Sequence, residues 1–330
     1  MKKEPVIRFA ENSERNQVLD LLNSVFCSQQ RTDYKRDDAY WNWKFRNSVF
    51  GSSILTVAED SGKIVGVDHL WPWELCFEGG IFKAVQPCDT VVHQDYRGRG
   101  LFKKMRSFGL KEAKKKGFRL AFNFPNENSL PGNQSLGATY LGKISWWVRI
   151  LRPLHLLASK IFDLKASELL FPKEYQIDSE YLDNLSRSVE ANDRFIQIHR
   201  TYGFHQWRYS EHPTRRYGMV KISEGSKQGA IIFTVVQNGA SLEMVCVDFV
   251  GDICRQKKVI RSLKSAAKNM NADFIAVMNN DLFKINGLWK YKFMKKRLKN
   301  MVVLPLNSER QEQFCSFERW SMVAGLHDSI

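Results

Sequence analysis

The segment best suited to chemistry spans residues 89–102, which read DTVVHQDYRGRGLF. A β-branched run ends in a short polar turn, and a helical pattern follows directly. Backbone amides at a helix N-terminus bind anions, and glycine lets a phosphate approach the main chain closely. Arg97 and Arg99 add positive charge beside Gly98 and Gly100. The pattern therefore predicts that a phosphorylated molecule docks in this loop.

Two common phosphate loops do not fit this spacing. A P-loop requires G-x-x-x-x-G-K-[ST], which the chain lacks. A Rossmann fingerprint requires G-x-G-x-x-G, and its third glycine would fall where Lys103 stands. An incidental pair of glycines at a strand-to-helix turn is the purely structural alternative.

The loop resembles the acetyl-CoA loop of the GNAT (GCN5-related) acyltransferases, whose pattern [QR]-x-x-G-x-[GA] follows a strand and precedes a helix. Residues 95–100 depart from it only where Asp95 replaces the usual Gln or Arg. The resemblance implies that backbone amides of the loop hold the pyrophosphate of acyl-CoA, so this departure is tolerable. It also implies an α/β fold with a mixed sheet and helices on both faces. Acyl-CoA would act as co-substrate, not as a permanently bound cofactor.

The same resemblance predicts the residues that bind acyl-CoA. The pantetheine arm would pair with the strand before the loop, and residues 124–129 resemble the Phe-Pro-Asn-x-x-Ser segment of one GNAT subgroup. Helix capping explains the serine of that segment equally well. The expected binding residues are Thr90, Val91, Val92, Arg97, Gly98, Arg99, Gly100, Leu101, Phe102, Asn126 and Ser129.

Acyl transfer to an amine requires positioning, an oxyanion donor and a route for the amine proton. Asp89 lies on the loop strand and is the first candidate base. A structural aspartate is the alternative, and it is favoured by an acid at the corresponding position of the second half, Asp248. His69 is the second candidate. Family members place a tyrosine acid where this chain has Asn133, so Tyr140 is the expected substitute.

Composition narrows the class of protein. A chain of 330 residues suits two domains, and a net charge of +15 suits polyanionic partners or, equally, a solvated basic surface. No two of its six cysteines are spaced as C-x-x-C, which argues against a zinc site and favours a reducing compartment. Because no apolar signal region or membrane-spanning stretch is evident, we expect a cytoplasmic protein without an integral membrane segment.

The second half resembles a worn copy of the first. Residues 43–45 (Trp-Lys-Phe) resemble residues 207–209 (Trp-Arg-Tyr), and residues 88–90 resemble residues 247–249, in the same order. Similar segments at a consistent offset are typical of a duplicated domain. In place of the loop glycines the second half has residues 256–259 (Gln-Lys-Lys-Val), so we expect it not to bind CoA.

We therefore predict two tandem GNAT-like domains, of which the second is degenerate. A CoA-binding catalytic domain would span residues 1–150, a linker residues 151–190 and the degenerate domain residues 191–330. The degenerate domain would complete the acceptor pocket or an interface. The sequence does not determine the oligomeric state and is compatible with a homodimer.

Tandem GNAT proteins of this length resemble the acyltransferases that modify amino sugars for surface polysaccharides. The resemblance implies transfer of an acetyl or short hydroxyacyl group, such as 3-hydroxybutanoyl, to a nucleotide-linked amino-dideoxy sugar, with dTDP the expected carrier. Acylation of a protein lysine or a small amine is the alternative within enzymes. A basic module that binds nucleic acid or a membrane surface is the alternative of another class, although no nucleic-acid-binding motif is present.

Overall fold

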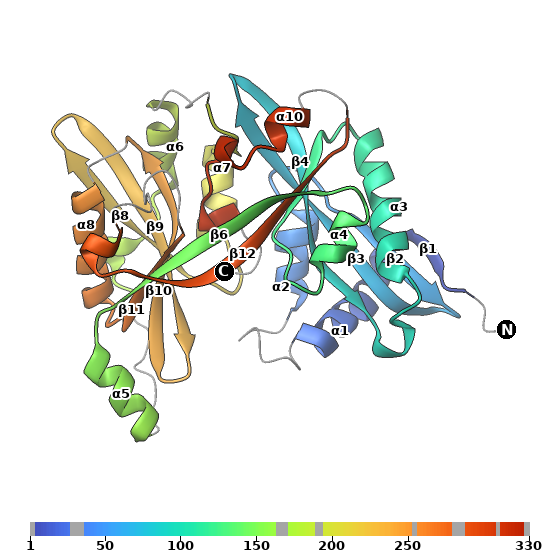
Figure 1. Cartoon of the computed structure of the whole chain (residues 1–330), viewed down its shortest axis with the longest axis horizontal. Coiled ribbons are helices and arrows are strands. Elements are labelled where there is room, and N and C mark those ends of the chain that lie inside the picture. The colour runs from blue at the N-terminus through green and yellow to red at the C-terminus, as the bar shows by residue number, and fades with distance from the viewer. Residues whose placement is uncertain are drawn as a thin grey trace. The chain divides into compact units, whose positions relative to one another are not determined.

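The computed structural model of the chain (Figure 1) describes residues 4–26, 36–162, 171–188, 194–252, 256–278, 288–307 and 311–326. These residues form a mixed α/β fold, which confirms the predicted fold class. The chain divides into two compact units, Met1–Gly142 with Asn300–Arg319, and Lys143–Lys299 with Trp320–Ile330. Among the described residues, no helix is both long and apolar enough to cross a membrane.

The first unit is built on a mixed sheet in the order β1-β2-β3-β4-β5-β12. Its neighbours pair antiparallel except β4 and β5, which are parallel. A hairpin joins β2 to β3, and its turn residues Ser61 and Gly62 both have positive φ, as a tight primed turn requires. The strands are β1 (Val6–Phe9), β2 (Ile54–Asp60), β3 (Lys63–Phe77), β4 (Gly80–Val92), β5 (Leu120–Asn123) and β12 (Met294–Pro305).

Helices cover both faces of this sheet. The apolar stripe of α1 packs with Val57, Val67 and Val91, whereas α3 packs with residues that alternate with these along the strands, such as Ala58 and Val65. The other described helices of the unit are short. The helices are η1 (Asn12–Glu14), α1 (Arg15–Phe26), α2 (Asp38–Trp41), the π-helical η2 (Asn42–Arg46), η3 (Gln94–Tyr96), α3 (Leu101–Lys115), α4 (Leu130–Gln134), α10 (Gln311–Phe314) and η7 (Phe317–Arg319).

The second unit contains the remaining strands of the sheet path, in the order β6-β11-β10-β9-β8, with β10 and β11 parallel. The buried face of α8 packs on this sheet through Val259, Ile260 and Leu263. The strands are β6 (Thr139–Ile150), β7 (Gln197–Ile198), β8 (Tyr217–Glu224), β9 (Lys227–Asn238), β10 (Ser241–Gly251) and β11 (Phe274–Met278). The helices are α5 (Pro153–Ile161), η4 (Lys173–Tyr175), α6 (Ser179–Ser188), α7 (Tyr202–His205), the π-helical η5 (Gln206–Ser210), α8 (Gln256–Asn269), η6 (Trp289–Tyr291) and η8 (Ala324–Leu326).

The expected linker at residues 151–190 is regularly folded where it is described. It carries α5, η4 and α6, and α6 buries Leu182 and Leu185 in the second unit. Two strands, β6 and β12, have residues in both units, so the chain passes between the units more than once. A prediction of domains as consecutive segments does not include a C-terminal segment that rejoins the first unit. That segment is assigned by its strand pairing, which the sequence alone does not give.

The two units also share an order of elements. In each, a short α-helix runs into a π-helical turn, followed by three antiparallel strands, a long helix and a strand parallel to the third: α2-η2-β2-β3-β4-α3-β5 and α7-η5-β8-β9-β10-α8-β11. The third strand of each series has a register shift, at residues 88–91 of β4 and at residues 246–248 of β10.

The C-terminus of α3 generates a stability prediction. Gly117 has φ of 79°, and the amides of Gly117 and Phe118 bond to the carbonyls of Lys114 and Ala113, which is a Schellman motif. Gly117→Ala should lower the free energy of unfolding by about 1–2 kcal/mol, because a Cβ is strained in the left-handed region. Urea unfolding measures the change. Lys116→Ala, at ordinary φ, is the control, and an equal effect of both substitutions would contradict the argument.

Candidate active site

The predicted phosphate loop connects β4 to α3. Gly98 and Gly100 have φ of 75° and 74°, and neither glycine has a heavy atom within 4 Å of the position that a Cβ would take. Their backbone conformation, not lack of space, therefore requires glycine. The first hydrogen bond along α3 runs from the Lys104 amide to the Gly100 carbonyl, at 3.1 Å. The amides of residues 101–103 thus have no acceptor within the helix and point out of its N-terminus.

Side chains of the loop fix its shape. Tyr96 donates a hydrogen bond to Asp60 of β2 at 2.7 Å, and the guanidinium of Arg99 lies over the Tyr96 ring at 4.7 Å. Arg99 also donates to the Asp95 carbonyl at 2.9 Å, and Arg97 donates to the Val92 carbonyl at 3.2 Å. Both arginines are exposed, so their charge is accessible to a ligand at the loop.

The strands beside the loop separate from one another. β4 and β5 pair only at Ala84 with Leu120 and at Val85 with Ala121, although β4 continues to Val92. Beyond these pairs, β4 remains bonded to β3 on its other side. The described part of β4 that contains Thr90, Val91 and Val92 therefore has no partner in β5.

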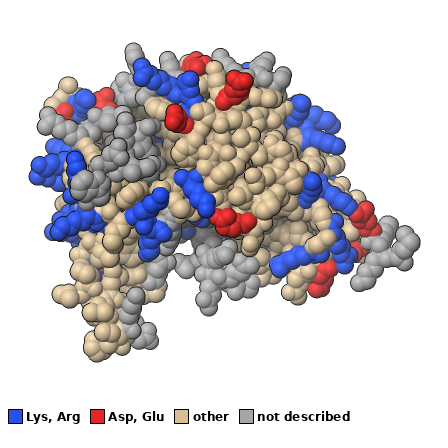
Figure 2. All heavy atoms as spheres, in the orientation of Figure 1, with Lys and Arg blue, Asp and Glu red and all other residues tan. Residues whose placement is uncertain are grey.

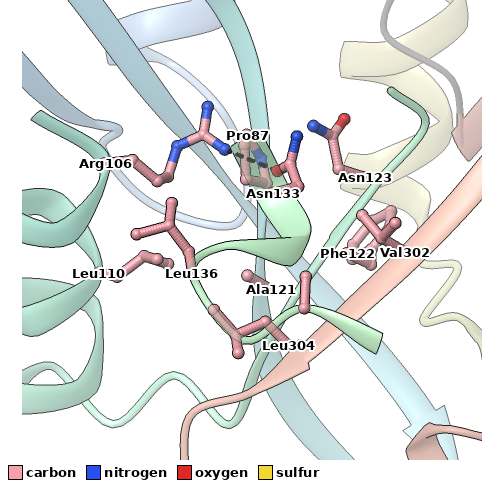
Figure 3. A pocket seen from close by; sticks show the side chains of 11 residues that line it. Pro87, Arg106, Leu110, Ala121, Phe122, Asn123, Asn133, Leu136, Val302 and Leu304 are labelled. Carbon is pink, nitrogen blue, oxygen red and sulfur yellow. Dashed lines mark hydrogen bonds between the residues drawn. The ribbon is translucent and has the colours of Figure 1, made fainter. Parts of the chain in front are cut away.

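A narrow pocket of about 270 Å³, its open mouth included, lies where β4 and β5 separate (Figure 3). At one end Arg106 and Asn133 point toward one another, and the apolar side chains of Leu110, Leu136 and Leu304 lie at the other (Figure 3). Its lining comes from β4, β5, α3, α4 and β12. The pocket is thus a slot with a polar end and an apolar end.

A buried ion pair locks α3 to the sheet beneath the loop. Arg106 binds both carboxylate oxygens of Asp68 at 2.7 and 2.8 Å, and it also donates to the Thr90 hydroxyl at 2.9 Å and to the Asn133 side chain at 3.2 Å. Thr90 in turn donates to Asp68 at 2.7 Å. One guanidinium therefore joins α3, β3, β4 and α4, with the planar two-point geometry that only arginine provides.

A second buried cluster surrounds Asp89, which sits at the register shift of β4 with φ of 44°. Its carboxylate accepts from Lys44 at 2.6 Å, from Tyr40 at 2.8 Å and from Arg36 at 3.0 Å. Burial alone would raise the pKa of Asp89, but the charges of Lys44 and Arg36 outweigh it and hold that pKa well below its usual range. Asp89 is therefore a permanently charged, fully engaged carboxylate.

His69 belongs to the same cluster. Its Nε2 lies 2.7 Å from Ser53 Oγ, and its Nδ1 lies 3.1 Å from Cys88 Sγ and 3.8 Å from Asp89. Burial lowers the pKa of His69 to about 4, so the ring is neutral at neutral pH. His69, Cys88 and Asp89 are close enough to share a metal ion, but the two buried cations on Asp89 make the cluster unfavourable for one.

The geometry separates the predicted catalytic residues. Asp89 and His69 come together but are almost completely buried, so the role of Asp89 as a base is revised to a structural one: a carboxylate stabilised in its charged form is a poor proton acceptor. Tyr140 lies on β6, exposed and outside both clusters.

Asn126 and Ser129 form the turn before α4, where the Ser129 amide donates to the Asn126 side chain at 2.9 Å. Ser129 makes no side-chain capping bond to α4.

Sequence reasoning missed the cations that organise both clusters. Arg36 and Lys44 precede or interrupt an aromatic run, and Arg106 lies among the apolar residues of α3. A charged residue within an otherwise apolar stripe was the available signal, because such a residue is buried only with a partner. Their partners are far away in sequence and could not be assigned without the fold.

The second unit contains a counterpart of the Asp89 cluster. Asp248 accepts from Arg200 at 2.8 and 3.0 Å and from Tyr209 at 2.8 Å. His205 is also buried there, and burial lowers its pKa to about 4. The residues expected to replace the glycine loop, 256–259, form the first turn of α8, and residues 253–255 before it lie outside the described residues.

Comparisons with known proteins agree with this geometry. Residues 6–140 match the family model described as an acetyltransferase (GNAT) domain. The crystal structure of a GCN5-related N-acetyltransferase from Anabaena variabilis ATCC 29413 superposes with a TM-score of 0.63 at 13% identity, over 92% of this chain and 73% of that chain. A protein of unknown function from Enterococcus faecalis V583, described as a probable N-acyltransferase, gives 0.61 at 11%, with coverage of 92% and 73%.

Saccharomyces cerevisiae N-myristoyltransferase with bound myristoyl-CoA is also similar, with a TM-score of 0.55 at 13% identity over 92% of this chain and 84% of that chain. A search of curated protein sequences finds no match. At these identities the solved structures establish the fold. The match to the acetyltransferase (GNAT) domain covers residues 6–140, and the solved N-acyltransferases share the fold of the chain.

The lowered pKa of His69 generates a prediction. As the pH falls, the unfolded chain, with a histidine pKa near 6.5, takes up a proton before the folded chain does. The contribution of neutral His69 to the free energy of unfolding is therefore fully present above pH 6.5 and is lost as the pH drops toward 4. His69→Gln should remove up to about 3 kcal/mol of this acid-dependent loss. Urea unfolding across this pH range measures it. His199→Gln, outside the cluster, is the control, and an unchanged pH profile for His69→Gln would refute the assignment.

Proposed function

We propose that acyl-CoA binds with its pyrophosphate on the loop at residues 97–102 and its pantetheine arm along Thr90–Val92 of β4, which do not pair with β5. The observation that carries this proposal is the coincidence of two features: helix amides exposed behind two left-handed glycines, and a strand edge that parts from β5 within reach of the same loop. An amide-containing arm can add to such an edge as a strand would. Asn126, in the turn after β5, would contact the arm near the pocket.

The transfer itself requires little acid–base machinery from the described residues. The amine of the acceptor attacks the thioester carbonyl, a C–N bond forms as the C–S bond breaks, and the amine proton passes to water. A backbone amide of β4 near its register shift would stabilise the oxyanion. Because Asp89 and His69 are buried, neither is the base in this scheme. Tyr140, which is exposed, is the proposed donor of a proton to the CoA thiolate.

The proposed acceptor is the amine of a nucleotide-linked amino-dideoxy sugar, with dTDP the expected carrier. Support comes from the turn at residues 124–129, whose sequence resembles that of sugar-modifying members, and from the surplus of Lys and Arg visible over much of the described surface (Figure 2). A diphosphate would use such charge. The proposed acyl group is acetyl or a short hydroxyacyl.

The second unit is proposed to be a degenerate copy of the first. The shared order of elements supports duplication, as do the two register-shifted acids, Asp89 and Asp248, each bonded to an arginine and a tyrosine. Asp248 has this arrangement although no glycine loop follows it in the sequence. We therefore assign the acid cluster a role in folding and the glycine loop the role in binding acyl-CoA.

The loop can be tested by substitution. Gly98→Val with Gly100→Val should weaken acetyl-CoA binding at least about tenfold, because a β-branched residue is strongly strained at positive φ. Calorimetric titration measures the affinity, and circular dichroism checks that the fold is kept. The matched control is Lys257→Ala with Lys258→Ala on α8, which should bind acetyl-CoA normally. Equal losses in both variants would contradict a single CoA site.

The acceptor can be tested separately by release of free CoA thiol. We expect a nucleotide-linked amino sugar to have a kcat/KM at least about tenfold above that of the free amino sugar, because charge-assisted contacts to the diphosphate strengthen binding. Acetyl-CoA and hydroxyacyl-CoA are the donors to compare. Turnover of lysine peptides without turnover of any nucleotide-linked sugar would overturn the acceptor and leave the acyl-CoA site standing.

A further inference from the structure

The helix α5 presents an apolar face to solvent. Leu154, Leu157 and Ile161 are exposed by 80%, 57% and 63%, and Phe162 directly after the helix is exposed by 70%. Residues spaced by three and four lie on one side of a helix. Figure 1 shows α5 extending from the end of β6, away from the strands of the second unit. An apolar face of this kind on a surface helix marks an interaction site more often than it occurs by chance.

The opposite side of α5 is firmly anchored, so the apolar face is held in place. His155 lies 2.7 Å from the buried Asp273, and Arg152 donates to the Asn271 carbonyl at 2.8 Å. The Leu151 amide also donates to the Asp273 carbonyl at 2.7 Å. The Asp273 carboxylate thus contacts the base of α5 through His155 and Arg152.

Cations gather beside the base of this helix. Arg149 lies on β6 just before α5. Lys268 lies near the C-terminal end of α8, three residues before Asn271, whose carbonyl accepts from Arg152. Lys264 and Lys268 lie one turn apart on α8, and the charge of Arg149 is the main cause that lowers the pKa of Lys264. Lys296 lies over the ring of Phe274, the residue paired with Ile150. In Figure 2 blue side chains gather above the tan tip at the lower left.

We propose that α5 and the cations at its base dock the second unit onto a lipid bilayer whose surface carries anionic headgroups. The exposed leucines, isoleucine and phenylalanine would enter the headgroup boundary, and the lysines and arginine would meet the negative surface. A second copy of this chain fits less well. A symmetric interface would set the same cations against each other, and four side chains bury less area than a stable dimer requires.

The test uses the full chain in co-sedimentation with vesicles. Wild-type protein should bind phosphatidylcholine vesicles that contain phosphatidylglycerol and not pure phosphatidylcholine vesicles. Lys264→Glu with Lys268→Glu should reduce binding about tenfold or more, because each cation contributes to the attraction. Leu154→Ser with Leu157→Ser should reduce it similarly, and both pairs are at least partly exposed, so the fold should survive. Lys63→Glu with Lys83→Glu, exposed residues of the first unit, is the charge-matched control and should bind like wild type.

Several results would overturn the proposal. They are absence of binding to anionic vesicles, equal loss in the control variant, or full binding by the leucine variant. Dimerisation that depends on Leu154 and Leu157, seen by analytical ultracentrifugation, would assign the face to a second copy instead. Binding to RNA that requires Lys264 and Lys268, with no vesicle binding, would assign the cations to a nucleic acid. Circular dichroism and acetyl-CoA binding confirm that each variant is folded.

Discussion

The carboxylate of Asp89 and the two buried cations that bind it constrain the geometry of β4 in the first unit. Asp89 occupies a positive-φ position at a register shift, which a non-glycine residue adopts only when its surroundings stabilise it. Lys44 and Arg36 supply that stabilisation, and the carboxylate in turn compensates the charge of both buried cations. The register shift sets the position of the last residues of β4, which lead into the loop. The ion cluster around Asp89 therefore helps to fix the strand edge next to the loop.

The second buried ion pair performs a complementary task on the other side of the sheet. Arg106 binds Asp68, the residue of β3 opposite the register shift, and also reaches Thr90 of β4 and Asn133 of α4. The helix that bears the anion-binding amides is thus fixed to the strand that would receive the pantetheine arm. A buried ion pair is weak evidence for net stability, because the cost of desolvating its charges can exceed their attraction. We infer that the arrangement holds loop and strand in register before a ligand arrives.

The second unit helps to distinguish architecture from chemistry. It keeps a register-shifted aspartate, an arginine and tyrosine on it, and a nearby histidine whose pKa is lowered by burial. It lacks the glycines after the third strand. A feature kept without the loop is best explained by folding requirements, which is why the acid cluster is assigned to the scaffold. The same comparison explains why acidic residues in β4 are poor guides to a catalytic base.

The sequence by itself determined the features that depend on neighbours along the chain. The left-handed glycines of the loop, the hairpin at residues 59–62 and the glycine that ends α3 were predictable, because local backbone geometry selects these residues directly. The tertiary structure alone decided the state of Asp89 and His69 and the course of β12. Arg36 and Lys44 reach Asp89 across 53 and 45 positions of the chain, and burial sets the pKa values there. Long-range pairing and desolvation exist only once the chain has folded, so no local pattern encodes them in readable form.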